Sequence, residues 1–170
     1  EASVRNQPTV SSSAAAPGGI PVTFAANNGD VGGGEVMLLA MARAAAQAGY
    51  AVTVVAPAHP GGVVAKAEAL GVATVVLAPD RRSYVADLRR WDRRRRGLLW
   101  ANGLVPTVAT TGHTGRVVHL HRGPQGLLQH SAAVLGRRGA LATVVPSRSL
   151  QRRAGGAIVL PNWHAPVRRT

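Results

Sequence analysis

Short apolar runs rich in valine, isoleucine and leucine alternate along the chain with longer stretches whose apolar residues recur at helical spacing. The short runs are bounded by glycine, proline or polar residues, which is typical of buried strands. Strands are predicted at residues 22–26, 51–57, 72–78, 97–102, 116–121, 140–146 and 157–162. The stretches between them predict helices at residues 34–48, 62–70, 81–96, 104–112, 125–136 and 147–153.

This alternation of strand and helix with short connections predicts an α/β fold. Right-handed crossovers then give a Rossmann-like, doubly wound, mostly parallel seven-stranded sheet with helices on both faces. Ligands of such folds bind beyond the carboxyl ends of the strands. A site is therefore expected among the loops at 27–35, 57–61, 78–82, 102–104, 121–125, 146–148 and 161–164.

Composition gives limits on domain organisation and location. The 170 residues, 46% of them hydrophobic, suffice for one domain with a buried core. We expect a flexible tail at 1–19, which is rich in Ser, Ala, Pro and Gly, one folded domain at 20–163, and the start of an interdomain linker at 164–170. Cysteine is absent, which excludes disulfides and thiolate metal sites. No signal-peptide or membrane-spanning run is visible, so we expect a cytoplasmic protein.

The stretch NNGDVGGGEV at 27–36 places Gly32, Gly33 and Gly34 where the first long helix begins. Backbone N–H groups and the positive end of the helix dipole favour a phosphate or carboxylate there. A tight turn without a ligand is the alternative. Glu35 and Val36 stand where a P-loop needs Lys followed by Ser or Thr, so a P-loop is excluded.

Dinucleotide binding is disfavoured for a separate reason. Met37 occupies the position of the third glycine in the dinucleotide fingerprint, and the second strand ends at Ala56 and Pro57 without a carboxylate for the ribose. No histidines and carboxylates share metal-ligand spacing, so no bound metal is expected.

The GGGE turn, followed by GYAVTVVAP at 49–57, resembles the amino-terminal, acceptor-side domain of GT-B glycosyltransferases of the retaining family 4. The resemblance extends from about residue 20 to 164, although Trp163 replaces the usual glycine after Asn162. Its other motifs are LGVATVVLAP at 70–79, VVHLHRGP at 117–124, VVPSRSL at 144–150 and VLPNW at 159–163.

The resemblance implies a hexosyltransferase that moves a sugar, with retention, from a nucleotide-diphosphate sugar to a hydroxyl acceptor. The nucleotide sugar would be a substrate, and no cofactor is implied. Because the family's carboxyl-terminal donor-binding domain is absent from these 170 residues, we expect the isolated chain to be inactive.

The resemblance also implies roles for individual residues. Gly32, Gly33 and Gly34 would lie near the donor phosphate and sugar, and Glu35 would cap the first helical turn. His121 would contact the transferred sugar and is the candidate catalytic residue; without the resemblance it would be interpreted as a loop histidine with satisfied hydrogen bonds.

Other polar residues lie at strand ends or near them. His59, Asn102 and Arg122 are candidates for the acceptor cleft, and a solvated loop arginine is the alternative for Arg122. His119 is expected to be packed, and Ser147 to cap the helix that follows it.

Arginine supplies almost all of the formal net charge of +13. Anionic partners and an arginine-rich codon bias are both consistent with this charge. In the basic helix at 81–96, an apolar stripe of Tyr84, Val85, Leu88 and Trp91 predicts packing on the sheet. The alternative is contact with an anionic membrane surface, for peripheral binding at its inner face, through Arg89, Arg90, Trp91, Arg93 and Arg94.

Two other classes of function remain open. One is a different Rossmann-type nucleotide-binding domain, such as a dehydrogenase or an epimerase. The other is a basic module for membranes or nucleic acid. No nucleic-acid partner is expected, because no recognition helix, RNP-like motif or stacking platform accompanies the arginines.

Overall fold

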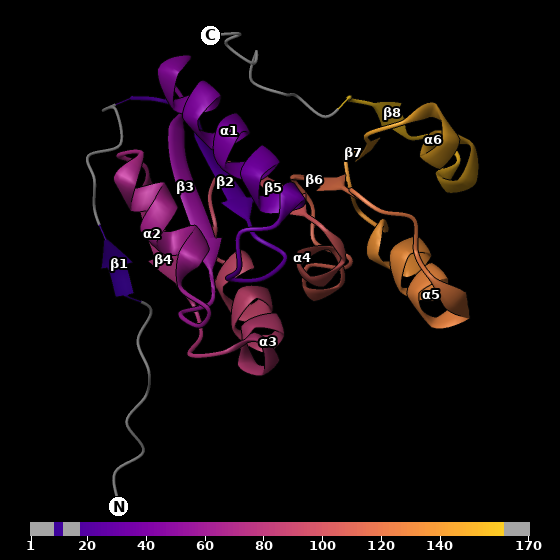
Figure 1. Cartoon of the computed structure of the whole chain (residues 1–170), viewed down its shortest axis with the longest axis horizontal. Coiled ribbons are helices and arrows are strands. Elements are labelled where there is room, and N and C mark those ends of the chain that lie inside the picture. Colours follow the sequence, from indigo (N-terminus) through magenta and orange to yellow (C-terminus); the bar gives the residue numbers. More distant parts are fainter. Residues whose placement is uncertain (1–8, 12–17, 162–170) are drawn as a thin grey trace, which may run out of the picture.

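The computed structural model describes residues 9–11 and 18–161, which form an α/β fold around one sheet (Figure 1). The strand order is β1-β4-β3-β2-β5-β6-β7-β8. The strands are β1 (Thr9–Ser11), β2 (Pro21–Ala25), β3 (Ala51–Ala56), β4 (Ala73–Val76), β5 (Leu98–Asn102), β6 (Arg116–His119), β7 (Ala142–Val145) and β8 (Ile158–Val159). All seven predicted strands form, and they are mutually parallel.

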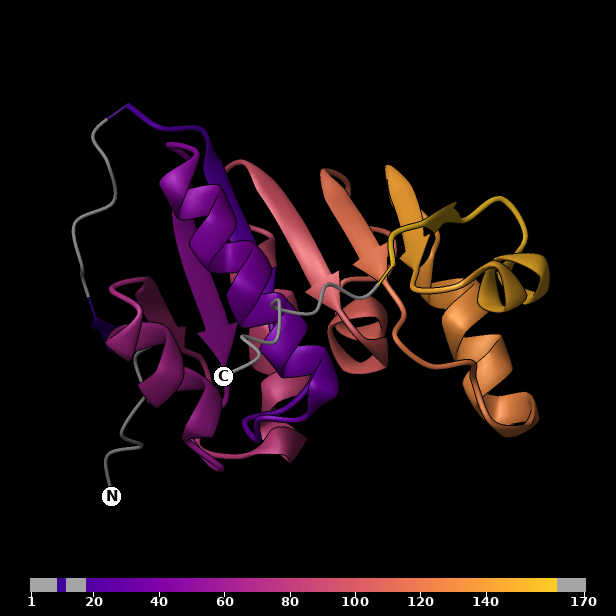
Figure 2. The same ribbon diagram turned by 45° about the horizontal axis from the view of Figure 1, so that its top comes forward.

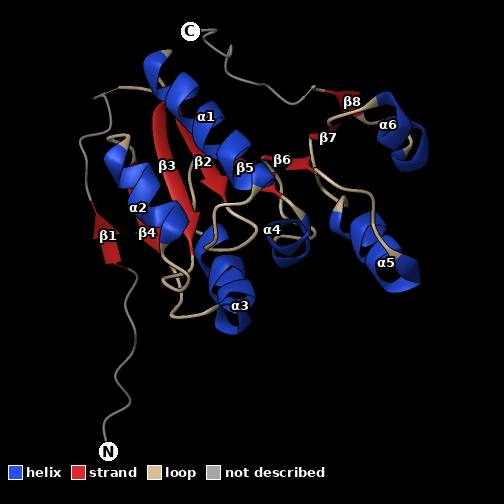
Figure 3. Cartoon of the chain, viewed as in Figure 1, coloured by secondary structure: helices blue, strands red, loops and turns tan. Residues whose placement is uncertain are grey.

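Helices connect the strands in the predicted order (Figure 3). They are α1 (Gly33–Gln47), α2 (Gly62–Ala69), α3 (Arg81–Asp92), α4 (Leu104–Ala109), α5 (Gly126–Gly136) and α6 (Arg148–Ala154). None of the helices that the structure describes has the length and apolar character needed to cross a membrane.

Neighbouring residues of the central strands enter different cores because their side chains point to opposite faces of the sheet. Phe24 and Val54 pack with α1 and α2, whereas Ala25 and Val55 pack with α3 and α4. Figure 2 shows α1, coloured indigo, lying across one face of the sheet. Burial on both faces explains why these strands are largely apolar, with only Thr23 and Thr53 as polar residues of β2 and β3, and do not alternate.

The chain reverses its direction across the sheet at β2. It passes from β2 to β3 and β4 on one side, then returns through α3 to β5 on the other side of β2. The loops after β2 and β5 therefore diverge and leave a crevice between them.

The structure differs from the sequence-based expectation in the tail, in the basic helix and in the length of other elements, since α4 ends at Ala109 and β6 at His119. β1, which pairs antiparallel with β4, lies within the expected tail, so residues 9–11 are part of the sheet. The basic helix ends at Asp92 and not at residue 96, because the chain must turn to reach Gly97, whose backbone touches Pro21. The expected domain end at 162–163 and the expected linker at 164–170 lie outside the described residues.

Candidate functional site

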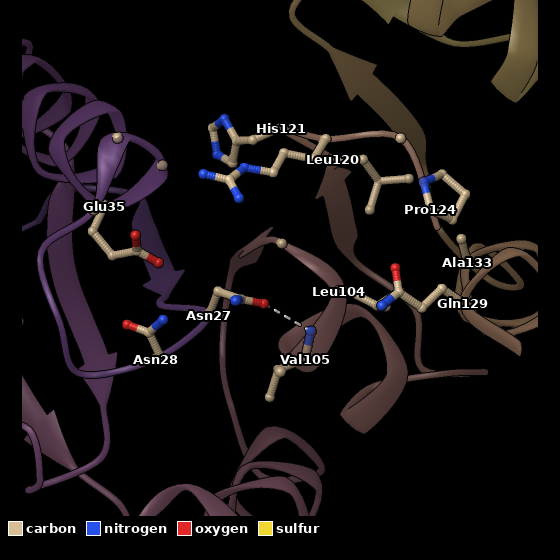
Figure 4. A pocket seen from close by; sticks show the side chains of 16 residues that line it. Asn27, Asn28, Glu35, Leu104, Val105, Leu120, His121, Pro124, Gln129 and Ala133 are labelled. Atoms are coloured by element: carbon tan, nitrogen blue, oxygen red, sulfur yellow. Dashed lines mark hydrogen bonds between the residues drawn. The ribbon is translucent and has the colours of Figure 1, made fainter. Parts of the chain in front are cut away.

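A groove of about 380 Å³ opens at the crevice, at the carboxyl ends of β2, β5 and β6 (Figure 4). It is bounded by the loop after β2, the first turn of α1, the start of α4, the loop after β6 and one side of α5. Its lining includes Asn27, Asn28, Gly32, Gly33, Gly34, Glu35, Gly103, Leu104, Val105, Leu120, His121, Arg122, Gly123, Pro124, Gln129 and Ala133. Three of the seven expected loops therefore build the groove.

The three predicted phosphate-site glycines have different surroundings. A Cβ atom on Gly33 would meet nothing within 4 Å, so this residue faces open space. A Cβ on Gly34 would lie 3.1 Å from Cδ2 of His121, so the helix backbone packs directly on the imidazole. The N–H of Gly32 donates to the carbonyl of Asp30 at 3.2 Å. The N–H groups left without partners in the described chain at this helix start are those of residues 33–35.

Another glycine of this loop is required by packing alone. A Cβ on Gly29 would lie 1.7 Å from the carbonyl oxygen of Pro60. The carbonyl of Gly29 also accepts from the N–H of Val63 at 2.9 Å. Part of the glycine content of the loop therefore serves its contact with α2 and not a ligand.

Asn102 fixes the orientation of His121 from behind the groove. Its side chain is fully buried and does not line the expected acceptor cleft. Its Nδ2 donates to the carbonyl of Gly34 at 3.0 Å, and its Oδ1 lies 2.6 Å from Nε2 of His121. Because Oδ1 can only accept, Nε2 of His121 carries the proton and Nδ1 is left as the acceptor in the neutral ring.

A second histidine supports the first. His119 is fully buried, as predicted, and its ring centroid lies 3.9 Å from that of His121. Its Nδ1 accepts from Nε1 of Trp100 at 3.3 Å, and within the described residues its Nε2 has no partner. Burial, aided by His121, lowers the pKa of His119 to about 3, and burial lowers the pKa of His121 as well. Both rings are therefore neutral near neutral pH.

Two charged residues face the groove. Arg122 is exposed and has no hydrogen bond or ion pair to any residue that the structure describes. Glu35 is buried in the first turn of α1, with Oε2 3.2 Å from the position that a Cβ of Gly32 would take. The expected side-chain cap by Glu35 does not form, because no side chain bonds the amides at this helix start. Its carboxylate instead lines the groove beside them.

His59 lies away from this groove. It is exposed in the loop after β3, where its N–H donates to the carbonyl of Pro79 at 3.2 Å. The loops at 57–61 and 78–82 bond to each other and contribute nothing to the groove lining. The structure therefore does not bring His59 together with His121 and Arg122.

The expected membrane surface on the basic helix is only partly exposed. Nη1 of Arg89 donates to the carbonyls of Ala109 and Thr111, each at 3.1 Å, and Trp91 packs against the buried core. The side chains of Arg89 and Trp91 therefore face the protein, and the expectation that they form a membrane surface is corrected. Three remain exposed, namely Arg90, which pairs with Asp87 at 2.8 Å, and Arg93 and Arg94, which follow the helix.

Several groove residues carried no recognisable signal in the sequence. Asn27 joins the two sides of the crevice, because its Oδ1 accepts from the N–H of Val105 at 3.0 Å (Figure 4). Gly103 is required there, since its φ is +106° and a Cβ would lie 2.6 Å from that same oxygen. Gln129 enters from α5, whose position follows from the strand order. Among the described residues, no three His, Cys, Asp or Glu side chains lie together in a way that could hold a metal ion.

Comparison of the sequence with protein-family models and with curated proteins gave no match. Among solved structures, the chain is similar to HepE of Anabaena in complexes with UDP-glucose, with UDP and glucose, and with UDP. The TM-scores are 0.65, 0.65 and 0.67 at 20% sequence identity. The matches cover 84% of this chain and 44% of the HepE chain, so this chain spans less than half of that length. This likeness establishes the fold.

Proposed function

We propose that this chain is the acceptor-side domain of a glycosyltransferase that moves a sugar from a nucleotide-diphosphate sugar to a hydroxyl acceptor. The observation that carries the proposal is one groove that holds both the unbonded amides at the start of α1 and the oriented, neutral His121. The fold similarity to HepE, whose structures contain UDP-glucose or UDP, and the GT-B-like motifs of the sequence support it.

The helix start would hold the diphosphate of the donor. Anionic oxygens accept hydrogen bonds from free N–H groups, and the dipole of the 15-residue helix α1 adds a favourable potential. Because Gly33 has no side chain and nothing lies within 4 Å of its Cβ position, the phosphate oxygens would have room beside this helix start. Arg122 lines the same groove and would neutralise part of their charge.

His121 would position the transferred sugar. With Nε2 donating to Asn102, Nδ1 is available to accept a hydrogen bond from a sugar hydroxyl. The lowered pKa keeps this acceptor unprotonated at neutral pH. The carboxylate of Glu35 offers a further acceptor for hydroxyl groups at the opposite side of the groove (Figure 4).

The proposal includes the features that the sequence resemblance implies. A second domain would close over the groove and hold the nucleoside part of the donor, while the helix start of this chain would hold the diphosphate, and the transfer would retain configuration. A peripheral position on an anionic membrane surface is included on the strength of the exposed Arg90, Arg93 and Arg94.

Titration with UDP-glucose, followed by amide and imidazole NMR signals of the 170-residue chain, tests the proposal. We expect shifts at Gly33, Gly34 and His121, and none on addition of NAD. Gly33→Val fills the open space and should abolish the shifts while the urea unfolding curve is preserved. Ala46→Val, which adds a branched side chain at the exposed far end of α1, is the matched control and should bind as wild type does.

Two results would contradict the proposal. One is saturable binding of NAD in this groove, which would favour a dehydrogenase. The other is unchanged UDP-glucose binding by Gly33→Val, which would remove the helix start from the site.

A further inference from the structure

The net positive charge of the protein lies entirely in one part of the chain. Residues 1–92 contain seven acidic and seven basic residues, whereas residues 93–170 contain thirteen arginines and no acidic residue. The second part builds β5 to β8 and α4 to α6. Arg95 still pairs with Asp92 at 2.6 Å, but the arginines beyond Arg96 have no carboxylate nearby in sequence and must find another partner or remain unpaired.

A second cavity lies in this part of the fold. It measures about 330 Å³ and is lined by residues of α5, α6 and the loop after β6. That volume is within the range of about 300–1,000 Å³ that is usual for small-molecule sites. Leu120, Val145 and Leu150 contribute apolar surface, while Arg122 and Arg153 contribute positive charge.

The arginines around this cavity differ in how they are bonded. All three nitrogens of the Arg137 guanidinium donate hydrogen bonds, one to Oγ1 of Thr143 at 2.9 Å and two to the carbonyls at the end of α6. Arg122 and Arg153 make no hydrogen bond or ion pair with any described residue. Nη1 of Arg153 lies 3.9 Å from the position that a Cβ of Gly123 would take, so its guanidinium reaches the loop residue that follows Arg122. Two unpaired arginines thus line one cavity.

The cavity adjoins the proposed sugar-transfer groove. The two share Leu120, Arg122, Gly123, Pro124 and Ala133 as lining residues. A molecule held beside Arg153 would therefore lie next to the groove of His121. The cavity is then in the right place to hold the acceptor of the reaction.

We propose that this cavity binds a phosphate ester of an apolar alcohol and that the acceptor belongs to this class. The planar guanidinium forks match phosphate oxygens, and the apolar lining accepts the hydrocarbon part. The acceptor role rests on the proposed glycosyltransferase function, whereas binding of the ester does not.

The test is titration of the 170-residue chain with hexyl phosphate, followed by calorimetry and by amide NMR signals of α5 and α6. We expect saturable binding that Arg153→Gln weakens about tenfold or more. Arg152→Gln is the matched control, because it removes the same charge from the adjacent, exposed position outside the cavity, and it should bind as wild type does. Hexanol and inorganic phosphate should each bind more weakly than the ester.

Three results would overturn the cavity proposal: no saturable binding, equal weakening by the two variants, or binding of inorganic phosphate as tight as that of the ester. The two proposals can fail separately. If hexyl phosphate binds through Arg153 but UDP-glucose gives no shifts, the sugar-transfer function fails and the cavity stands. If UDP-glucose binds at Gly33 and hexyl phosphate does not bind, the cavity proposal fails alone.

Discussion

Acid should destabilise the fold through the neighbouring rings of His119 and His121 at the groove. His119 has a pKa of about 3 in the folded protein and about 6.5 in the unfolded chain. Between these values the unfolded state binds a proton that the folded state does not bind. The free energy of unfolding must therefore fall as the pH falls below 6.5.

The size of the effect follows from the same pair of values. Between the folded and unfolded pKa values of His119, each pH unit changes the free energy of unfolding by about 1.4 kcal/mol. The part of the interval from about pH 7.5 to pH 5 that counts lies below 6.5, so the free energy of unfolding falls by about 2 kcal/mol over it. This amount is a large fraction of the usual net stability of a domain, which is roughly 5–15 kcal/mol. His121, whose pKa burial also lowers, adds to the loss with the same sign.

Urea unfolding of the wild type and of His119→Asn at both pH values measures the effect. Asparagine retains an oxygen near the position of Nδ1 that can accept from Nε1 of Trp100, but it does not titrate. The variant should be less stable overall and should lose less stability on acidification. The difference between the unfolding free energies of the two proteins at each pH removes the contribution of titrating groups far from the substitution, because both proteins share it. An identical loss in both proteins would refute the neutral state of His119 in the folded protein.

Three further results are expected. Asn102→Ala should remove the single Nε2-protonated tautomer of His121, seen in the imidazole ¹⁵N shifts. It should also lower the free energy of unfolding by about 2 kcal/mol, because the part-buried Nε2–H of His121 and the part-buried carbonyl of Gly34 lose their partner. Arg116→Leu should cost about 3 kcal/mol or more in urea unfolding, because Arg116 is buried and its guanidinium donates to carbonyls near the ends of α4 and α5. Arg89→Gln should lower the free energy of unfolding by about 1–2 kcal/mol, because its hydrogen bonds to two carbonyls are lost. Arg93→Gln should leave the free energy of unfolding unchanged, and of these two variants only Arg93→Gln should weaken binding to anionic vesicles.

The strands could be predicted because burial on both faces makes them largely apolar. Phe24 and Ala25 are adjacent in sequence and lie in different cores, so both positions are apolar and only Thr23 is polar in that run. The short edge strand β1 could not be found in this way, since its three residues pair with β4 through backbone groups that any sequence carries.

The position of the site could be predicted only in part. The residue pattern gives the carboxyl ends of all strands but not the strand order, and the order decides which loops meet. Because β2 lies between β3 and β5, the loops after β2, β5 and β6 form the groove, and the loop of His59 lies elsewhere. The role of Asn102 was not visible either, since it depends on a contact with Gly34, which is distant in sequence.

Several arginines use backbone carbonyls as partners in a chain that has 20 basic and only seven acidic residues. Arg89, Arg116 and Arg137 donate to carbonyls at or near the ends of α4, α5 and α6, where the helix dipoles are negative and carbonyl groups lack intrahelical partners. Backbone carbonyls thus take the place of carboxylates as partners of these residues. Arg122 and Arg153 reach no such helix end, and both border the cavity between α5 and α6. Arg122 and Arg153, which have neither a carboxylate nor a carbonyl partner among the described residues, are therefore available for an anion.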